Sequence, residues 1–433
     1  MYVLVVAALV LQSIGTYLIW PSRWNIPAHL ALGFCVTAYL VPGLLTDVWD
    51  FADPATNALY AQINIVGALA LIAGLFVGRK VALFDEVSKR FLKLYESARL
   101  RAAVLRRIEF ISTYAVLGMA AAYIIMGFIP MFAEDPFAAK QFKDQYFEPY
   151  HRAAYLFRGS FSILVAAIPL LFVIWWIRRR RIKPLILGLS AVGLITVSLA
   201  RQSSALGVLT FLGLIGARSR KGTRRFMFLT AVIYPLGSAA YLLLGLLTGI
   251  TSFTTIYSVN SVADIVSSGA PDIHDQLYFL EGFRYLNTFT YGKTFWGGLV
   301  PGNYMWNPSV WTLTYDNPGA DISDWITGGY RFTTALWGYC DFGWVGVLLV
   351  PFLSGLLTGA MIRALRKLPL DKSLLASALV MSVYMTFGSQ ITEFFALSIH
   401  NIPSIICALY ACFGLPRLFR RRRGAAATLS PAH

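Results

Sequence analysis

The sequence predicts an all-α polytopic membrane protein with about eleven transmembrane helices, and three observations support this fold class. The 433 residues are 57% apolar and only 13% charged, whereas a soluble domain averages about 25% charged residues. The mean hydropathy of the chain is +0.62. Apolar runs of about 17–23 residues recur along the chain, each long enough to cross a bilayer as a helix. We therefore expect a single transmembrane domain over residues 1–433 rather than a set of soluble modules.

The predicted spans are joined by connections of very different length, and the tightest connection is the turn that contains Arg201. In order, the spans cover residues 2–20, 27–45, 58–77, 108–130, 158–177, 184–200, 203–217, 226–248, 339–362, 373–395 and 399–416.

Lysine and arginine indicate the orientation of these spans. The chain has 37 basic and 21 acidic residues, a net charge of +16. A soluble protein with this charge would suggest nucleic acid, but cytoplasmic loops of membrane proteins are normally rich in lysine and arginine, so we expect no nucleic-acid partner. An even number of predicted spans separates each of four basic clusters from the next, so all four can lie on the cytoplasmic side. These clusters are residues 178–181, 218–225, 363–367 and 420–423. The N-terminus is then outside and the C-terminus inside.

The segments between the spans differ in character. Residues 78–107 form a cytoplasmic amphipathic segment whose apolar face is predicted to rest on lipid, and residues 417–433 form a basic cytoplasmic tail. On the outer side lie a loop at residues 131–157 and a large loop at residues 249–338, in which we expect short helices. The large loop carries more carboxylates than any other connection, so we expect the chemistry there.

Few arginines are predicted on the outer side, so each basic residue there is a candidate for a functional role. Arg201 is the strongest candidate, because it lies between two apolar runs where an ionisable group is costly. Several arginines around one cavity suit a phosphate or pyrophosphate, whose oxygens the guanidinium group binds bidentately. Alternatively, Arg201 pairs with a structural carboxylate or caps carbonyl groups. The predicted outer cations are Lys140, Lys143, Arg152, Arg158, Arg201, Arg284, Lys293 and Arg331.

No metal or other cofactor is predicted. The four cysteines lack metal-ligand spacing, and the outer acidic pairs are D-x-x-D rather than D-x-D. Aromatic side chains crowd the large loop between Asn and Gly residues, a pattern that fits either an interfacial belt or stacking against sugar rings.

Three stretches of the second half resemble the Wzy-type oligosaccharide repeat-unit polymerases, membrane glycosyltransferases of the GT-C class. They are Tyr291-Gly-Lys-Thr-Phe-Trp-Gly-Gly-Leu-Val-Pro301, Gly328-Gly-Tyr-Arg-Phe332 and Gly338-Tyr-Cys-Asp-Phe-Gly-Trp-Val-Gly346. The resemblance implies an inverting, metal-independent enzyme in the bacterial inner membrane, with its active site on the periplasmic face. Its substrates would be glycans linked to undecaprenyl diphosphate, and its partners membrane lipid and, as a further candidate, a chain-length regulator.

The resemblance also assigns roles to residues. Outer-loop arginines of the family map onto Arg201, Arg284 and Arg331, and less directly onto Arg158 and Arg152. Lys293 and Tyr291 lie in the first motif and are candidates for substrate binding. The family often has a glutamate shortly before the last motif, where this chain has Asp341.

Transfer of a sugar from a lipid diphosphate needs cations to stabilise the departing pyrophosphate and a base to accept the proton of the acceptor hydroxyl. The candidate bases are Glu281, His274, Asp341 and His400, with Asp341 and His400 also candidates for substrate binding. Glu281 leads because it precedes Arg284 by three residues and would share its helical face. Each of these residues could instead be an ion-pair partner or a solvated loop residue.

Two other functions fit the same architecture. The first is an O-antigen ligase, which moves a finished glycan to a lipid A core. The second is a transporter or flippase of lipid-linked oligosaccharides, which inverted repeats with broken helices would favour. The sequence shows no such repeat.

Overall fold

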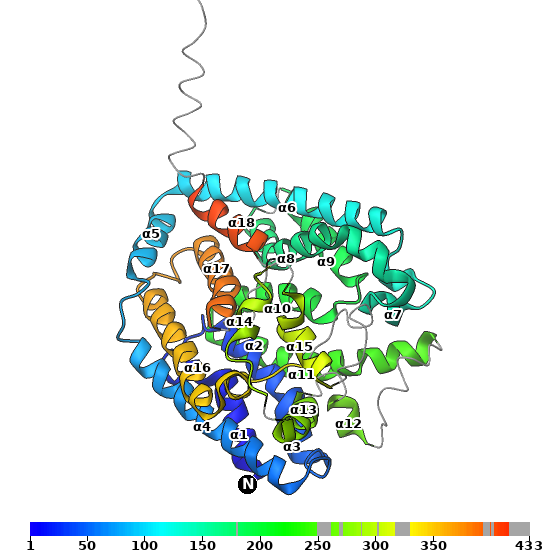
Figure 1. Cartoon of the computed structure of the whole chain (residues 1–433). Helices are drawn as coiled ribbons and strands as arrows, with labels where there is room; N and C mark the ends of the chain where they lie inside the picture. Colours follow the sequence, from blue (N-terminus) through cyan, green and yellow to red (C-terminus); the bar gives the residue numbers. More distant parts are fainter. Residues whose placement is uncertain are drawn as a thin grey trace, which may run out of the picture.

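The computed structural model describes residues 1–178, 181–248, 261–267, 272–286, 288–300, 303–316, 330–392, 399 and 402–414. Over this part of the chain the regular structure is helical and contains no strand (Figure 1). The α-helices are α1 (Tyr2–Ile14), α2 (Ile26–Cys35), α3 (Val41–Leu45), α4 (Pro54–Gly78), α5 (Asp85–Glu96), α6 (Ala98–Met126), α7 (Pro136–Gln141), α8 (Phe147–Ile177), α9 (Lys183–Thr196), α10 (Arg201–Gly216), α11 (Arg220–Thr248), α12 (Val262–Ser267), α13 (Asp272–Leu286), α14 (Lys293–Gly297), α15 (Pro308–Asp316), α16 (Thr334–Arg366), α17 (Leu374–Thr392) and α18 (Ile402–Phe413).

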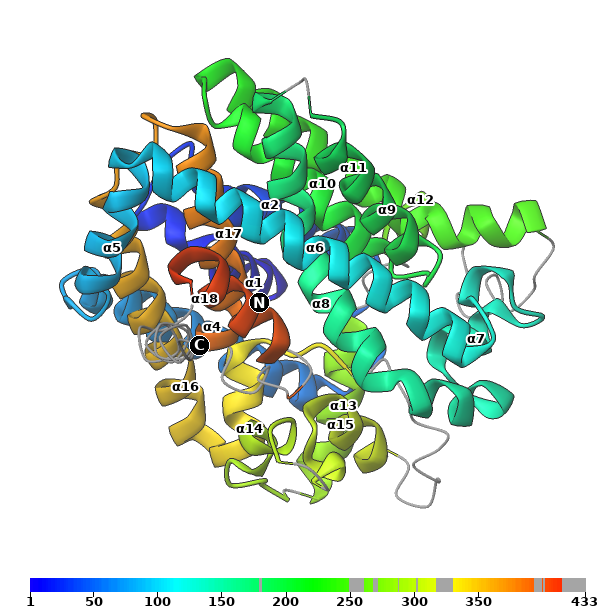
Figure 2. The ribbon, with the colours of Figure 1, turned by 90° about the horizontal axis from the view of Figure 1, so that it is seen from above.

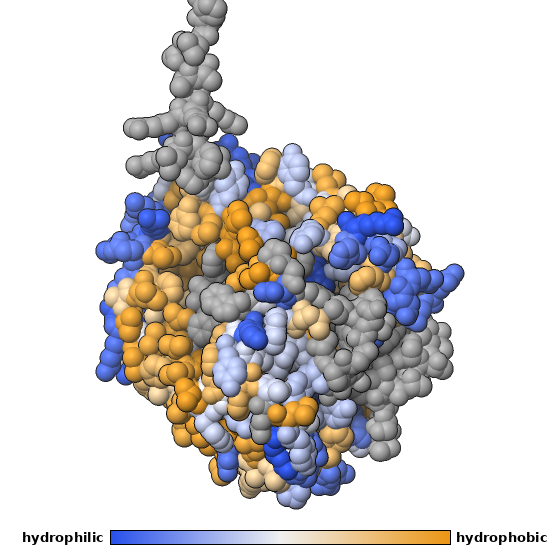
Figure 3. Space-filling model, in the orientation of Figure 1, coloured by the Kyte–Doolittle hydropathy of each residue, from blue (hydrophilic) through white to orange (hydrophobic). Residues whose placement is uncertain are grey.

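Five helical segments are long and apolar enough to cross a membrane: Ile26–Leu45, Pro54–Gly78, Ala98–Phe132, Asp144–Ile177 and Thr334–Arg366. Shorter apolar helices accompany them, including α9 and α18. Hydrophobic side chains cover much of the flank formed by α4 and α16, whereas hydrophilic ones gather around α5 and α7 (Figure 3). The all-helical membrane fold is therefore confirmed, while eleven spans with the N-terminus outside stays a prediction.

The turn predicted at Arg201 lies slightly earlier in the chain. Helix α9 ends at Thr196 and α10 begins at Arg201, so residues 197–200 make the connection. Leu199 has a left-handed φ of +59° in this turn.

Helices α4 and α16 touch through their backbones, because glycines face each other across the contact. A Cβ atom on Gly74 would lie 2.1 Å from the carbonyl oxygen of Phe352, and one on Gly355 would lie 2.2 Å from that of Leu71. Gly74 belongs to a G-x-x-x-G sequence with Gly78, and Gly355 belongs to another with Gly359. Such small-residue motifs let helices approach closely in lipid, where hydrophobic burial between helices gains little.

Helix α16 is a helical hairpin rather than one continuous span. Its helical backbone is interrupted at Phe342 and at Gly343, which has a φ of +61° and a ψ of −144°. A Cβ atom on Gly338 would lie 2.2 Å from the carbonyl oxygen of Gly346, so the two halves run back along each other. Ala335 and Pro351 both contact the position of a Cβ atom on Gly67. The first half, residues 334–341, is therefore antiparallel to the second, and the predicted span over 339–362 begins at the hairpin turn.

The amphipathic segment predicted at residues 78–107 contains α5 and the start of α6. The apolar face of α5 packs partly into the bundle: Phe91 and Leu94 are buried at 7% and 2% exposure, whereas Val87 on the same face is 40% exposed. The Tyr95 hydroxyl also lies 3.0 Å from Ser377 Oγ of α17. Helices α6, α16 and α17 contact α5, and the contact of its apolar face with lipid stays a prediction.

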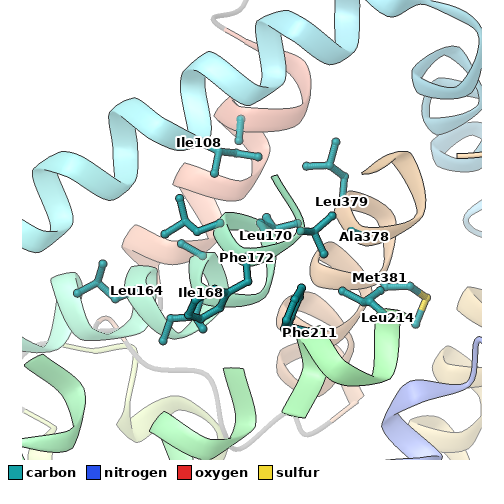
Figure 4. Close-up of a cluster of buried hydrophobic side chains, with 14 of the residues drawn as sticks. Ile108, Leu164, Ile168, Leu170, Phe172, Phe211, Leu214, Ala378, Leu379 and Met381 are labelled. Atoms are coloured by element: carbon teal, nitrogen blue, oxygen red, sulfur yellow. The ribbon is translucent and has the colours of Figure 1, made fainter. Parts of the chain in front are cut away.

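The larger hydrophobic core joins α6, α8, α10 and α17. Side chains such as Ile108, Ile168, Leu214 and Met381 meet between these helices (Figure 4). A second core lies under α13 and α15, which group with α14 on one face of the bundle beside α16 (Figures 1 and 2). The described residues of the sequence motifs lie on or beside this face.

Candidate functional site

Helix α13 positions the polar cluster that best fits a reaction site. Its apolar side packs into the second core, where Ile273, Leu277 and Leu280 are each 0% exposed. This anchoring fixes the first turn of the helix, which carries Asp272, His274 and Asp275. We call these three residues, together with Arg331, the α13 cluster.

Arg331 and Asp272 form an ion pair within the cluster. Arg331 Nε lies 3.3 Å from Asp272 Oδ1, and the side chains are 49% and 3% exposed. Burial raises the pKa of Asp272 above its ordinary value, and the Arg331 charge opposes that rise. The guanidinium group therefore holds a buried carboxylate with one nitrogen while about half of its surface stays accessible.

Asp275 and His274 complete the cluster, and burial shifts the pKa of both groups. Burial, and secondarily the Asp272 charge, raise the pKa of Asp275 to about 7. Burial lowers the pKa of His274, whose Nδ1 lies 4.0 Å from Asp275 Oδ1. Near pH 7 the cluster thus contains a neutral imidazole, a half-protonated carboxyl group and a guanidinium ion, which suits proton transfer beside an anion.

Aromatic rings border the cluster. The Phe51 ring lies 4.2 Å from the His274 ring and 5.9 Å from Tyr278, which in turn lies 6.3 Å from Tyr330. Phe51 and Tyr278 are each 46% exposed. Flat, half-exposed rings beside acid–base groups suit the apolar faces of sugar rings.

A buried polar network supports the cluster from below. Gln276 Nε2 donates to the carbonyl oxygen of Arg331 at 2.6 Å, and the Tyr60 hydroxyl donates to Gln276 Oε1 at 2.9 Å. Farther along, Asn64 Oδ1 accepts hydrogen bonds from Thr333 and Gln12 at 2.9 and 3.1 Å. These bonds tie α13 and the start of α16 to α4 and α1, so the segment at Arg331 is held on both sides.

Arg284 lies elsewhere, at the other end of α13, and joins this helix to α4. Its Nη1 lies 2.8 Å from Asp53 Oδ1 and 3.0 Å from Thr56 Oγ1. Asp53 also caps α4 by accepting the amides of Ala55 and Thr56. The hydrogen bond to Asp53 raises the pKa of Arg284, and Asp53 rather than Glu281 is its ion-pair partner. The positions of Asp272 and Arg284, twelve residues apart, are about 18 Å apart along the helix.

This geometry predicts coupling between Asp53 and Arg284. Asp53→Asn and Arg284→Ala should each lower the melting temperature of the purified protein, because each removes the same ion pair. The double variant should lose no more than the larger single loss, since coupled partners are not additive. Arg152→Ala, on an exposed position of α8, is the control and should change little. Additive losses from the two variants would show that the pair contributes nothing.

The first and third sequence motifs meet around Asp341, which is 0% exposed. Asp341 Oδ1 accepts hydrogen bonds from Thr290 Oγ1, from Thr294 Oγ1 at 2.8 Å and from the Gly292 amide at 3.2 Å. Tyr291 is 73% exposed, and its amide donates to the Asp341 carbonyl oxygen. The Tyr291–Thr294 loop is therefore a clamp on the hairpin turn, and Asp341 is enclosed by it rather than facing solvent.

The remaining predicted residues lie apart from the α13 cluster. Lys293 lies 4.6 Å from the centroid of the Trp306 ring. The Arg158 guanidinium lies over the Tyr150 ring, and its Nε donates to the Tyr150 hydroxyl. Arg152 is exposed on α8. The side chain of Arg201 and the whole of His400 lie outside the described residues, so only the backbone of Arg201, at the start of α10, is placed.

Among the predicted site residues, Arg331 and His274 thus belong to one cluster, and Tyr291 lies in the loop that encloses Asp341. Sequence reasoning missed the acid–base potential of Asp275 and the role of Asp272. The signal for these two residues in the sequence is Asp272-Ile-His-Asp275, which places two carboxylates beside a histidine. Within the described residues, no group of three or more His, Cys, Asp or Glu side chains could hold a metal ion.

These features define the class of the protein: an α-helical membrane protein with a polar, aromatic-lined cluster above its helices. No protein-family model, no curated protein and no solved structure matches the chain.

The raised pKa of Asp275 predicts a pH-dependent stability. An unfolded aspartate has a pKa near 3.8, whereas Asp275 in the folded protein titrates near 7. Between these values the folded state holds one more proton than the unfolded state, so this group makes stability fall as pH rises, by about 1.4 kcal/mol per pH unit at most. Asp275→Asn should remove this loss. Its melting temperature relative to the unmodified protein should therefore increase from pH 4.5 to pH 7.

His274 has the opposite effect on the pH dependence of stability. Because burial lowers its pKa, this group makes the folded state less stable as pH falls below about 6.5. His274→Gln is the matched comparison, and its melting temperature relative to the unmodified protein should increase toward low pH. A pH-independent difference between Asp275→Asn and the unmodified protein would contradict the raised pKa.

Proposed function

We propose that the chain is a membrane glycosyltransferase of the repeat-unit polymerase type. It moves a growing glycan from undecaprenyl diphosphate to the non-reducing end of a lipid-linked repeat unit. We place it in the bacterial inner membrane with about eleven spans, and place the α13 cluster on the periplasmic face. The observation that carries the proposal is the α13 cluster: a half-exposed arginine beside two groups that can exchange a proton near pH 7.

The cluster fits the needs of an inverting transfer. The acceptor hydroxyl oxygen attacks the anomeric carbon of the growing glycan, and the bond from that carbon to the phosphate oxygen breaks. The proton of the hydroxyl passes to the His274–Asp275 pair, where the neutral imidazole accepts it and the carboxylate stabilises the resulting cation. Arg331 stabilises the charge that accumulates on the departing undecaprenyl diphosphate. The rings of Phe51 and Tyr278 orient the sugar.

Reconstitution tests the proposal. The purified protein, given one lipid-linked repeat unit and no other acceptor, should make a ladder of polymers on a gel. His274→Gln should keep its fold but lose chain growth by about 100-fold or more, the usual contribution of a general base. A ligase would make no ladder under these conditions. A ladder that His274→Gln, Asp275→Asn and Arg331→Ala all leave unchanged would overturn the assignment of the site.

The hairpin in α16 favours a second candidate, a transporter of lipid-linked oligosaccharides. Transporters often bind their substrates at the ends of half-helices within the membrane, and residues 334–341 form such a half-helix. Proteoliposomes separate the two functions. Transfer of a fluorescent lipid-linked oligosaccharide between leaflets, without chain growth, would assign transport instead of polymerisation.

A further inference from the structure

A cavity of about 290 Å³ lies within the bundle, between α1, α2, α4, α16 and α17. Its polar lining includes side chains on three of these helices: Gln12, Ser13, Thr334, Ser354, Thr358 and Tyr384. The volume is close to the lower limit for small-molecule pockets, which begin near 300 Å³. The residues of the α13 cluster do not line it, so it is a separate site.

The half-helix of α16 begins at this cavity. Residues 334–341 are eight residues long and run antiparallel to the second half, and Thr334 and Ser354, one from each half, both line the cavity. The Thr333 side chain caps the amide of Leu336. Among the described residues no acceptor receives the amides of Thr334 and Ala335. The first turn of this half-helix therefore offers backbone donors at a point inside the membrane-spanning segment.

Buried polar groups in the lining provide an independent observation. Ser354 is 4% exposed and lines the cavity, and its side-chain hydroxyl makes no hydrogen bond within the described part of the chain. Gln12 Nε2 donates hydrogen bonds to the backbone and side-chain oxygens of Asn64, and these bonds fix the orientation of the Gln12 amide. Gln12 Oε1 is then an acceptor without a donor. A buried hydroxyl group without a partner is destabilising, and a polar ligand bound in the cavity would give the Ser354 hydroxyl a partner.

The residues that line the cavity indicate which kind of ligand it can bind. None of the lining residues is Asp, Glu, Lys, Arg or His, and the remaining walls include Leu71, Leu75 and Met361. A diphosphate here would be a buried charge without a counter-ion, which is costly inside a membrane. A neutral ring with many hydroxyl groups fits better, because it both donates and accepts hydrogen bonds and has apolar C–H faces.

We propose that this cavity binds one neutral sugar ring of the lipid-linked glycan, at a site distinct from the α13 cluster. This proposal depends on the proposed function in one respect, namely that the sugar belongs to a lipid-linked glycan. The cavity adds affinity for the glycan part of the substrate, and the α13 cluster acts on the diphosphate end. The glycan would thus reach into the bundle past the start of α16.

Binding in detergent tests this assignment with two probes, an undecaprenyl-diphosphate-linked repeat unit and undecaprenyl diphosphate alone. The unmodified protein should bind the repeat unit more tightly than the bare lipid. Ser354→Leu fills the cavity and should weaken binding of the repeat unit by roughly tenfold or more, while binding of the bare lipid stays unchanged. Val345→Leu adds bulk at a 61% exposed position of the same helix and should bind both probes normally.

A second variant guards against misfolding of Ser354→Leu. Thr358→Val keeps the side-chain shape, and loss of its hydroxyl should weaken binding of the repeat unit several-fold without lowering the melting temperature. If both variants keep the full preference for the repeat unit, or if the unmodified protein shows none, the cavity holds only water and the proposal fails. If the preference is lost as expected but no polymer ladder forms, the cavity site stands and the polymerase assignment fails instead.

Discussion

Gly346→Ala is expected to prevent the two halves of α16 from packing and to leave little folded protein. A Cβ atom at this position would lie 1.8 Å from the carbonyl oxygen of Gly338, which is backbone and cannot rotate away. Relief requires the halves to separate, which would disturb the contacts of Ala335 with α4 and the clamp around Asp341. We expect a loss of about 3 kcal/mol, at the upper end for an overpacked core, seen as a lower melting temperature and an aggregated fraction in size-exclusion chromatography.

Substitutions at two other glycines provide comparisons for the stability of Gly346→Ala. Gly343→Ala should also destabilise, by about 1–3 kcal/mol, because its backbone conformation is one that essentially only glycine adopts. Gly193→Ala on α9 is the control, since a Cβ atom there meets nothing within 4 Å, and it should fold normally. A Gly346→Ala protein as stable as Gly193→Ala would show that the halves of α16 do not pack as described.

The helices could be predicted from hydropathy, but the hairpin could not. Each apolar run becomes helical, because lipid or a packed bundle leaves backbone groups no other partners. Hydropathy measures how apolar a run is and says nothing about its direction, so it predicts a single span over residues 339–362 and no hairpin. The turn depends on Gly343 in a glycine-only conformation and on the pairing of Gly338 with Gly346. The paired G-x-x-x-G sequences at Gly74 and Gly355 were a readable signal for the contact between α4 and α16.

The candidate site, too, could be predicted from the sequence only in part. Arg331 and His274 could be selected from the sequence, because cations and imidazoles in an outer loop are few. The partner of Arg284 could not, since Asp53 is 231 residues away and Glu281 is the nearest carboxylate on the same face. The pKa of Asp275 depends on burial next to Asp272, and burial is set by the docking of α13 onto α4. Local sequence contains the ionisable groups but not the environment that shifts their pKa values.

Arg331→Ala is expected to cause the largest loss of activity, about 100- to 1,000-fold in the rate of chain growth. This is the usual effect of removing one group that stabilises a developing negative charge. The substitution also leaves the buried Asp272 carboxylate without its cation, so the melting temperature should fall as well. Activity and stability must therefore be separated before the role of Arg331 can be assigned.

The double variant Arg331→Ala/Asp272→Asn makes this separation, because it removes the buried charge together with its partner. It should regain most of the lost melting temperature, since a neutral amide costs far less to bury than an unpaired carboxylate. Chain growth should stay low, because no guanidinium group is left to stabilise the departing diphosphate. Arg331→Lys should be intermediate, keeping the charge but losing the fork that binds phosphate oxygens in pairs. If the double variant recovered chain growth along with stability, Arg331 would be a structural partner of Asp272 and the reaction would need another cation, for which Arg201 at the start of α10 is the next candidate.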